Sequence, residues 1–232
     1  MIFQRDELST VVCNIRIPRG KEEEVGTAIF IVKDNKVILL TAAHVVRNLD
    51  ANAYAILSDK NATPLRVPLS DLLGGASFIP HKSADLAKAE IQITNKNQSL
   101  LQNRCFPFEQ VEINQISISK DLLLTSVGFP LGLGATGNKF SPLTFRTYVS
   151  APLVTLPRFD NGIPCDFIIL ELPSIGGYSG GPLFDLGYII AGAMTSHTGD
   201  TILHGIVHGT ISDPTGGKLA AITPCSYLNG WI

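Results

Sequence analysis

The sequence lacks the features that mark several large classes of protein. It has no cluster of lysines and arginines, and 18 basic against 20 acidic residues give a net charge of −2, so we expect no nucleic-acid partner. No apolar run approaches the roughly 18 residues of a membrane-spanning helix, so we expect no membrane partner either. Acidic Asp6 and Glu7 stand where a secretory signal would need a basic tip and an apolar stretch. These absences predict a cytoplasmic protein.

Cysteine is also scarce and scattered. The chain has four cysteines and no CxxC pair, a pattern that suggests neither a zinc site nor a disulfide framework. We therefore expect free thiols and no bound metal or other cofactor. The cysteines are Cys13, Cys105, Cys165 and Cys225.

The residues that are abundant favour an all-β fold. The chain is 45% hydrophobic and 16% charged, with 21 glycines and 14 prolines, as in proteins made of short strands joined by turns. Apolar runs at 26–32 and 37–41 flank a polar turn and predict a hairpin. Alternation of small apolar and polar residues over 85–93 predicts a half-buried strand. Further strands are expected at 122–130, 167–172, 182–184, 188–195 and 218–222.

The strands divide between two halves of the chain. A polar stretch at 110–120 separates them, and we place the boundary between residues 115 and 116. Two barrels of antiparallel strands suit halves of this size. Thr223 and Pro224 have the residue types of a helix start and predict a short helix near the C-terminus.

Three short segments carry a possible catalytic chemistry. Glycines surround Ser179 in the segment GGYSGGPL at 176–183, His44 lies in LLTAAHVV at 39–46, and Asp85 lies in SADLA at 83–87. A serine nucleophile needs a base that works near neutral pH, which is histidine, and a carboxylate can orient that histidine. The N–H groups of Gly177 and Ser179 are candidate donors to an oxyanion.

These segments, in the order His, Asp, Ser and with spacings of 41 and 94 residues, resemble the trypsin-like (chymotrypsin-fold) serine peptidases. The chain looks most similar to the bacterial high-temperature-requirement branch, without a PDZ domain. The resemblance implies two six-stranded antiparallel barrels and a short C-terminal helix, with residues 1–115 carrying His44 and Asp85 and residues 116–232 carrying Ser179. It also implies that His44 is the base, Asp85 orients it, Ser179 attacks, and Gly177 and Ser179 form the oxyanion hole.

The resemblance extends to substrate binding and regulation. It implies that the strand 193–197 pairs with the substrate backbone and that Ser174, Thr195, Ser196 and His197 line the pocket. His197 could then select a polar or acidic substrate residue, although a rim position without a specific role is the simpler interpretation. Tyr178 stands where trypsin relatives carry an aspartate that pairs with a new N-terminus, so we do not expect activation by trimming.

Other interpretations of these residues are weaker. Asp59, Asp71 and Asp121 compete for the carboxylate role, but only Asp85 precedes a strand within an Asp-Leu-Ala sequence. Residues 132–137 match the dinucleotide pattern GxGxxG, but residues 138–142 do not open the helix that would bind the phosphates.

His204 and His208 have the spacing of a helical metal site. The neighbouring glycines and β-branched residues argue against a helix there, and structural or surface roles are expected instead.

The sequence therefore predicts a serine endopeptidase that hydrolyses protein or peptide substrates through an acyl-enzyme. The alternative is a latent or inactive peptide-binding module of the same fold, whose oxyanion hole depends on a regulatory protein partner.

Overall fold

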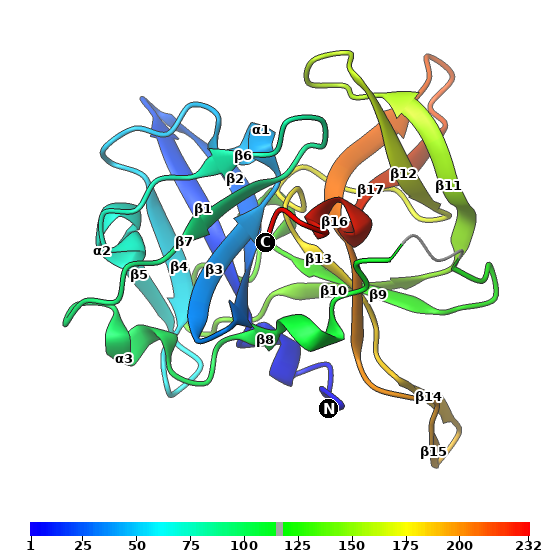
Figure 1. The fold of residues 1–232 in the computed structure, drawn as a ribbon, viewed down its shortest axis with the longest axis horizontal. Coiled ribbons are helices and arrows are strands. Elements are labelled where there is room, and N and C mark those ends of the chain that lie inside the picture. Colours follow the sequence, from blue (N-terminus) through cyan, green and yellow to red (C-terminus); the bar gives the residue numbers. More distant parts are fainter. Residues whose placement is uncertain (115–117) are drawn as a thin grey trace.

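The computed structural model describes residues 1–114 and 118–232 and consists mainly of two β-sheets (Figure 1). All strands of one sheet precede residue 108, and all strands of the other follow residue 123. The predicted boundary at 115 and 116 lies outside the described residues. The two sheets come from separate parts of the chain.

The first sheet has the strand order β5-β4-β1-β2-β3-β7-β6, and β8 is added to β2 as its parallel partner. Short helices decorate its loops. The elements are β1 (Val12–Arg19), β2 (Glu22–Lys33), β3 (Lys36–Thr41), α1 (Ala43–Val46), β4 (Tyr54–Ser58), β5 (Pro64–Pro68), α2 (Leu69–Leu73), β6 (Ile79–Pro80), β7 (Ala87–Glu90), α3 (Gln98–Leu101) and β8 (Phe106–Pro107), with 3-10 helices η1 (Glu7–Ser9) and η2 (Phe108–Gln110).

The second sheet is antiparallel, in the order β10-β9-β13-β16-β17-β12-β11. β10 ends at Thr147 and β11 begins at Val149, so the two edge strands of this sheet are consecutive in the chain. The elements are β9 (Leu124–Gly128), η3 (Pro130–Gly132), β10 (Leu143–Thr147), β11 (Val149–Pro157), β12 (Pro164–Leu170), β13 (Pro182–Asp185), β14 (Tyr188–Ala191), β15 (Met194–His197), β16 (Ile202–Ser212), β17 (Lys218–Pro224) and η4 (Cys225–Leu228).

The all-β class is confirmed, with differences in detail. The described residues form sheets of eight and seven strands rather than six each, because two-residue strands β6 and β8 join the first sheet and the run 143–157 is divided at Tyr148. The helix near the C-terminus is a single 3-10 segment, η4. The four cysteines are unpaired. Among the described residues, no helix has both the length and the apolar character to cross a membrane.

The predicted hairpin of β2 and β3 is confirmed, and it places the candidate histidine. Asp34 and Asn35 form its turn with φ of 49° and 62°, left-handed values that Asp and Asn tolerate better than most residues. β3 then pairs with β7 so that Thr41 lies opposite Ala87. The chain segments after β3 and before β7 are therefore neighbours, and these carry His44 and Asp85.

Buried apolar side chains fill each sheet and the space between the two sheets. One cluster lies inside the first sheet and includes Phe30 and Leu39, and a second lies inside the other sheet and includes Leu183 and Ile222. The largest cluster joins side chains of both halves, such as Phe106 with Phe184. The two halves therefore share a continuous core.

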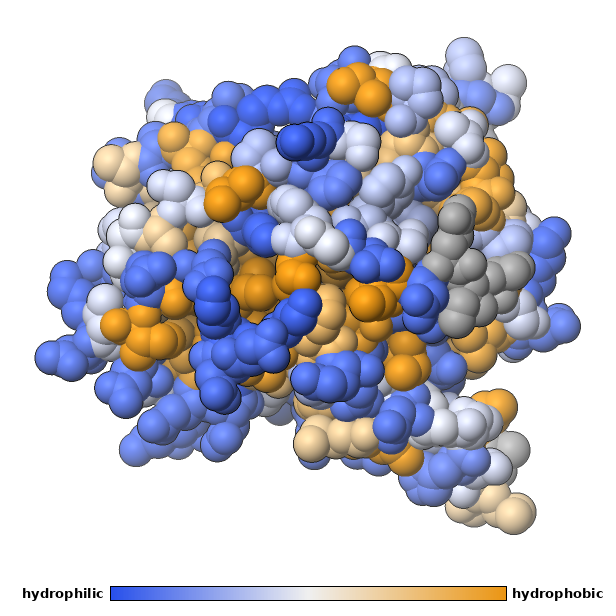
Figure 2. All heavy atoms as spheres, in the orientation of Figure 1, coloured by the Kyte–Doolittle hydropathy of each residue, from blue (hydrophilic) through white to orange (hydrophobic). Residues whose placement is uncertain are grey.

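The run 188–195 was predicted as one strand, and this prediction is wrong. The chain turns back at Gly192, which has a φ of 61°, and forms the two-stranded sheet β14–β15. This hairpin projects from the body of the protein at the lower right of Figures 1 and 2. Three of its large apolar side chains are exposed, those of Ile189, Ile190 and Met194.

Candidate active site

The Ser179 loop is docked between the two sheets. On the side of the first sheet, the Thr27 N–H donates to the Ser179 carbonyl at 2.8 Å. On the side of the second sheet, the Gly180 N–H donates to the Val207 carbonyl at 2.8 Å. A Cβ at Gly180 would lie 2.0 Å from the Thr27 carbonyl oxygen, and the φ of Gly180 is 85°. Only glycine allows this close approach.

Tyr178 anchors the same loop to β10 of the second sheet. Its side chain is buried, its hydroxyl donates to the Leu143 carbonyl at 2.7 Å, and its ring stacks on Phe145. A buried tyrosine with a satisfied hydroxyl gives both apolar contact and a fixed orientation. The backbone on either side of Ser179 is therefore held in place.

The two N–H groups that the sequence predicts as oxyanion donors are available to a ligand. Neither Gly177 N–H nor Ser179 N–H donates a hydrogen bond to another described residue. The Gly176 carbonyl accepts a hydrogen bond from the Leu131 N–H at 2.6 Å, and because a trans peptide directs its C=O and N–H oppositely, the Gly177 N–H points away from Leu131. The Gly177 carbonyl accepts from Thr27 Oγ1 at 2.9 Å. The two predicted oxyanion donors are thus both unpaired.

His44 and Asp85 form the contact that the sequence predicts. The His44 Nδ1 lies 2.6 Å from Asp85 Oδ2, and the His44 backbone N–H donates to Asp85 Oδ1 at 3.0 Å. Asp85 is fully buried. The carboxylate therefore fixes both the main chain and the ring of His44, which leaves His44 Nε2 as the nitrogen that can act on a substrate.

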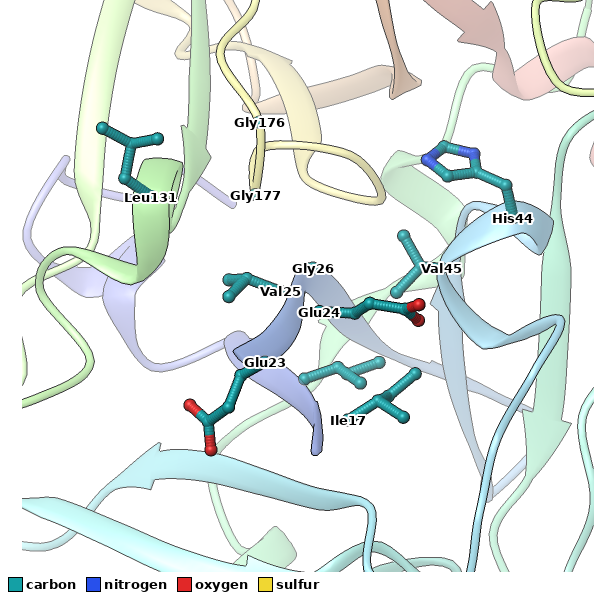
Figure 3. A pocket seen from close by; sticks show the side chains of 11 residues that line it. Ile17, Glu23, Glu24, Val25, Gly26, His44, Val45, Leu131, Gly176 and Gly177 are labelled. Carbon is teal, nitrogen blue, oxygen red and sulfur yellow. The ribbon is translucent and has the colours of Figure 1, made fainter. Parts of the chain in front are cut away.

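His44 and the Ser179 loop border the same cavity, which has a volume of about 490 Å³. His44 and Val45 lie on one side of it, and Gly176, Gly177 and Leu131 lie on the other (Figure 3). The cavity is open to solvent, and its lining is mainly apolar. It brings the candidate base and a candidate oxyanion donor to one space.

Two further residues bind the buried carboxylate, and the sequence did not identify them. His208 Nδ1 lies 2.6 Å from Asp85 Oδ2, and Arg158 Nη2 lies 3.3 Å from Asp85 Oδ1. Burial by itself raises the pKa of Asp85, but the hydrogen bonds from His208 and His44 outweigh it and hold that pKa well below the usual range. Asp85 is therefore a carboxylate at neutral pH.

The ligand atoms of His44, Asp85 and His208 lie within 4.8 Å of one another, a grouping that can also suit a metal ion. Both nitrogen-to-oxygen distances are 2.6 Å, which is a hydrogen-bond length. Each histidine has a proton to donate and the carboxylate accepts both. We therefore interpret the cluster as hydrogen-bonded.

The Ser179 hydroxyl points to the second sheet. Its Oγ donates to the His208 carbonyl at 3.1 Å, and no hydrogen bond joins it to His44 among the residues that the structure describes. His208 thus contacts both Ser179, through its backbone, and Asp85, through its side chain.

The tip of the hairpin β11–β12 covers this cluster. The Phe159 ring packs edge-on against His44 at 5.1 Å and lies 4.2 Å from the His208 ring. A Cβ at Gly209 would lie 2.6 Å from the Phe159 ring, so glycine at this position makes room for it. Asp160 pairs with Arg158 at 2.8 Å and also with Arg47. A chain of charges therefore joins the hairpin to the first sheet.

The predicted substrate-binding residues are only partly near the site. The Ser174 carbonyl accepts a hydrogen bond from Thr210 Oγ1 at 2.6 Å, beside the Ser179 loop. Thr195, Ser196 and His197 lie instead on β15, where they are exposed and pair with β14. The strand that runs beside Ser179 is β16 and not the predicted strand 193–197.

The alternatives considered from the sequence do not reach this cluster. The GxGxxG segment opens no helix: η3 ends at Gly132, and a loop follows it. Asp71 contacts Lys96 at the surface, and Asp59 caps its own loop. His204 and His208 lie on a strand, as the glycines suggested.

Known structures with the same architecture support this description. The MamO protease domain from Magnetospirillum magneticum matches with a TM-score of 0.63 and 17% identity, over 99% of each chain. The Rv3671c protease from M. tuberculosis, in its active form, matches with a TM-score of 0.60 and 17% identity, over 96% of this chain and 79% of that one. The fold is that of the trypsin-like serine proteases.

An HtrA-type protease, AlgW with a tripeptide, shares this trypsin-like fold with a TM-score of 0.56 and 20% identity, over 93% of this chain and 56% of that one. No model of a known protein family matches the sequence, and no curated protein matches it either. At these identities the likeness concerns the fold, and the chemistry of the site has to be argued from its own residues.

Proposed function

We propose that this protein is a serine endopeptidase that cleaves protein or peptide substrates through Ser179, His44 and Asp85. The observation that carries the proposal is that the N–H groups of both Gly177 and Ser179 have no acceptor among the described residues, while the N–H groups of Tyr178, Gly180 and Gly181 in the same loop are hydrogen-bonded. Fixed donors without an internal acceptor are what a developing oxyanion requires. No metal or cofactor is needed for this chemistry.

The reaction begins with a rotation of the Ser179 side chain. The hydroxyl leaves the His208 carbonyl, at the cost of one hydrogen bond or about 1 kcal/mol, and turns toward His44. Oγ then attacks the substrate carbonyl carbon while His44 Nε2 takes its proton, and Asp85 stabilises the charged ring through Nδ1. His44 returns the proton to the leaving amine, and water hydrolyses the acyl-enzyme by the same steps.

The edge of β16 is the proposed peptide-binding surface. β16 pairs with β13 only as far as Ile206, so beyond Val207 the edge that faces the Ser179 loop has no strand partner among the described residues. An extended peptide can add to such an edge by backbone hydrogen bonds. AlgW, which has this fold, was solved with a tripeptide.

A fluorophosphonate probe tests the proposal directly, because it reacts only with an activated serine. We expect the isolated protein to be labelled and the Ser179→Ala variant to be unlabelled while its circular dichroism and melting temperature stay unchanged. Labelling of Ser179→Ala at the rate of the native protein would disprove the assignment. A known serine hydrolase in the same reaction controls for probe quality.

A latent peptide-binding module is the second candidate, and the orientation of the Ser179 hydroxyl favours it. A hydroxyl that donates to the His208 carbonyl is not activated. Rv3671c, with the same fold, was solved in an active and an inactive form. In this case a regulatory protein partner would complete the site.

The two candidates differ in the behaviour of the isolated protein. The latent module predicts no labelling of the isolated protein, together with retained binding of extended peptides along β16, which backbone amide shifts of Gly209 and Thr210 would report. Rapid labelling of the isolated protein supports the peptidase and excludes latency.

A further inference from the structure

His208 is the residue of the site that the mechanism above leaves without a role. It lies on β16, its side chain is 3% exposed, and its Nδ1 is 2.6 Å from Asp85 Oδ2. The same oxygen is bound by His44 Nδ1 at 2.6 Å. One carboxylate oxygen therefore accepts from two imidazole rings, one on α1 in the first half of the chain and one on β16 in the second half.

The surroundings of His208 fix its tautomer. Its ring stacks on Phe167 at 4.9 Å and lies against Phe159, and its Nε2 is buried without a hydrogen-bond partner among the described residues. Because Asp85 is the acceptor at Nδ1, the ring carries its proton there and leaves Nε2 unprotonated. A protonated Nε2 would be a buried donor with no acceptor, which is costly.

His208 cannot replace His44 as the base. Its Nε2 is enclosed by aromatic rings, whereas His44 borders the cavity next to the Ser179 loop. Its contacts are instead with the other members of the site, since its backbone carbonyl accepts the Ser179 hydroxyl at 3.1 Å.

We infer that His208 is a positioning residue, which takes up part of the hydrogen-bonding capacity of Asp85 Oδ2 and so limits how strongly this carboxylate holds the protonated His44 ring. The inference rests on the proposed role of His44 and Asp85. A carboxylate that receives several donors is a weaker partner for each of them. Loss of the His208 donor therefore strengthens the bond between Asp85 and His44 and favours the protonated ring.

The other charged and titratable groups that face the cluster come from two directions. Arg158 and Asp160 come from the tip of β11–β12, and Arg47 follows α1. His81, on the loop before Asp85, is close enough to Arg158 to be affected by its charge. These groups are unchanged in a His208 variant, so a difference between variant and native protein reports on His208.

Nuclear magnetic resonance of the histidine rings tests the inference without any need for catalysis. In the native protein we expect two ring N–H protons shifted strongly downfield, one from His44 and one from His208, because each is donated to the same carboxylate at a short distance. The Asp85→Asn variant should lose both shifts. A native spectrum in which only His44 shows such a proton would overturn the inference.

The variant His208→Phe fills the same apolar space and removes the donor, and His208→Asn keeps an N–H that can reach Asp85. We expect the pH midpoint of the His44 ring titration to rise by about half a unit or more in His208→Phe and to stay close to native in His208→Asn. An unchanged midpoint in a folded His208→Phe would also overturn the inference. If that variant does not fold, His208→Ala also removes the donor and gives the same comparison.

This experiment separates the two proposals. A native protein that no fluorophosphonate labels contradicts the peptidase, yet its ring titrations still report whether His208 shares Asp85. A labelled protein whose His44 titration ignores His208 contradicts only the positioning role. If both proposals hold, the acid limb of the labelling rate moves to higher pH in His208→Phe by the same amount as the ring titration, because His44 must be unprotonated to act.

Discussion

Two hairpins of the C-terminal half behave in opposite ways. The hairpin β11–β12 folds back onto the first sheet, where Arg158 is 4% exposed and binds Asp85, Asp160 and the Ser83 carbonyl. The hairpin β14–β15 projects from the body, and its Met194 is 76% exposed. The sequence predicts part of the second hairpin at the site and no role there for the first. The difference teaches that proximity to the site was decided by charged contacts at a turn and not by the apolar pattern of the strands.

Removal of the Arg158 side chain, in the docked hairpin β11–β12, should lower the free energy of unfolding more than any other change described below. Arg158→Ala leaves the buried carboxylates of Asp160 and Asp85 without their shared cation, and breaking a buried pair costs about 3 to 5 kcal/mol. Urea unfolding measures this loss. Arg47→Ala removes the exposed end of the same charge chain and should cost less than about 1 kcal/mol. Equal losses in the two variants would contradict the buried role of Arg158.

Acid should destabilise the hairpin β11–β12, which is docked on the first sheet, before it affects the projecting hairpin β14–β15. The pKa of Asp85 is lowered in the folded protein, so its contribution to stability is present at neutral pH and is lost as the pH falls below about 4, the ordinary carboxyl value. Hydrogen exchange measured down to pH 3 should show faster opening at residues 158–163 and no comparable change at β14–β15. In Asp85→Asn this pH dependence should be largely absent, since the variant side chain does not titrate.

Phe159→Ala should have a smaller effect. The ring is 60% exposed, and an aromatic contact of this kind contributes about 1 kcal/mol. The His44 and His208 ring signals should nevertheless shift, because Phe159 lies against both. Unshifted signals would show that the hairpin tip does not cover the site in solution.

The projecting hairpin should give the smallest effects. His197→Ala should change stability by less than about 0.5 kcal/mol, as is usual for exposed side chains. A substrate library should show the same preference before and after the change, because His197 lies on β15 and not beside Ser179. A changed preference would return His197 to the substrate pocket.

The sequence predicted the parts of the site that depend on local signals. The Asp34 and Asn35 turn sets the register of β2 and β3, and the strand ends that follow place His44 beside Asp85. The glycines around Ser179 likewise predicted a loop with free N–H groups. Each of these features can be recognised from residues that lie close together in the sequence.

The rest of the site depends on pairing between distant strands. Nothing in the local sequence distinguishes the run that forms β16 from the run 188–195, which forms β14 and the start of β15, as the neighbour of Ser179. Both runs contain apolar and β-branched residues. His208 was noted only for its spacing from His204, yet its position one residue after Val207, which pairs with the Ser179 loop, is what brings it to Asp85. The signal available in the sequence was a histidine followed directly by a glycine. Gly209 leaves room for the Phe159 ring, which packs against His208.

The close fit of Gly180 against Thr27 has a mechanical consequence. The nucleophile is encoded in the second half of the chain, but its backbone is attached to the first half, where the proposed base resides. The same loop is also hydrogen-bonded to Val207 of the second half, so any sliding of one barrel over the other would have to break bonds on one of its two sides. The loop therefore ties the two halves together at the point where alcohol and imidazole have to meet.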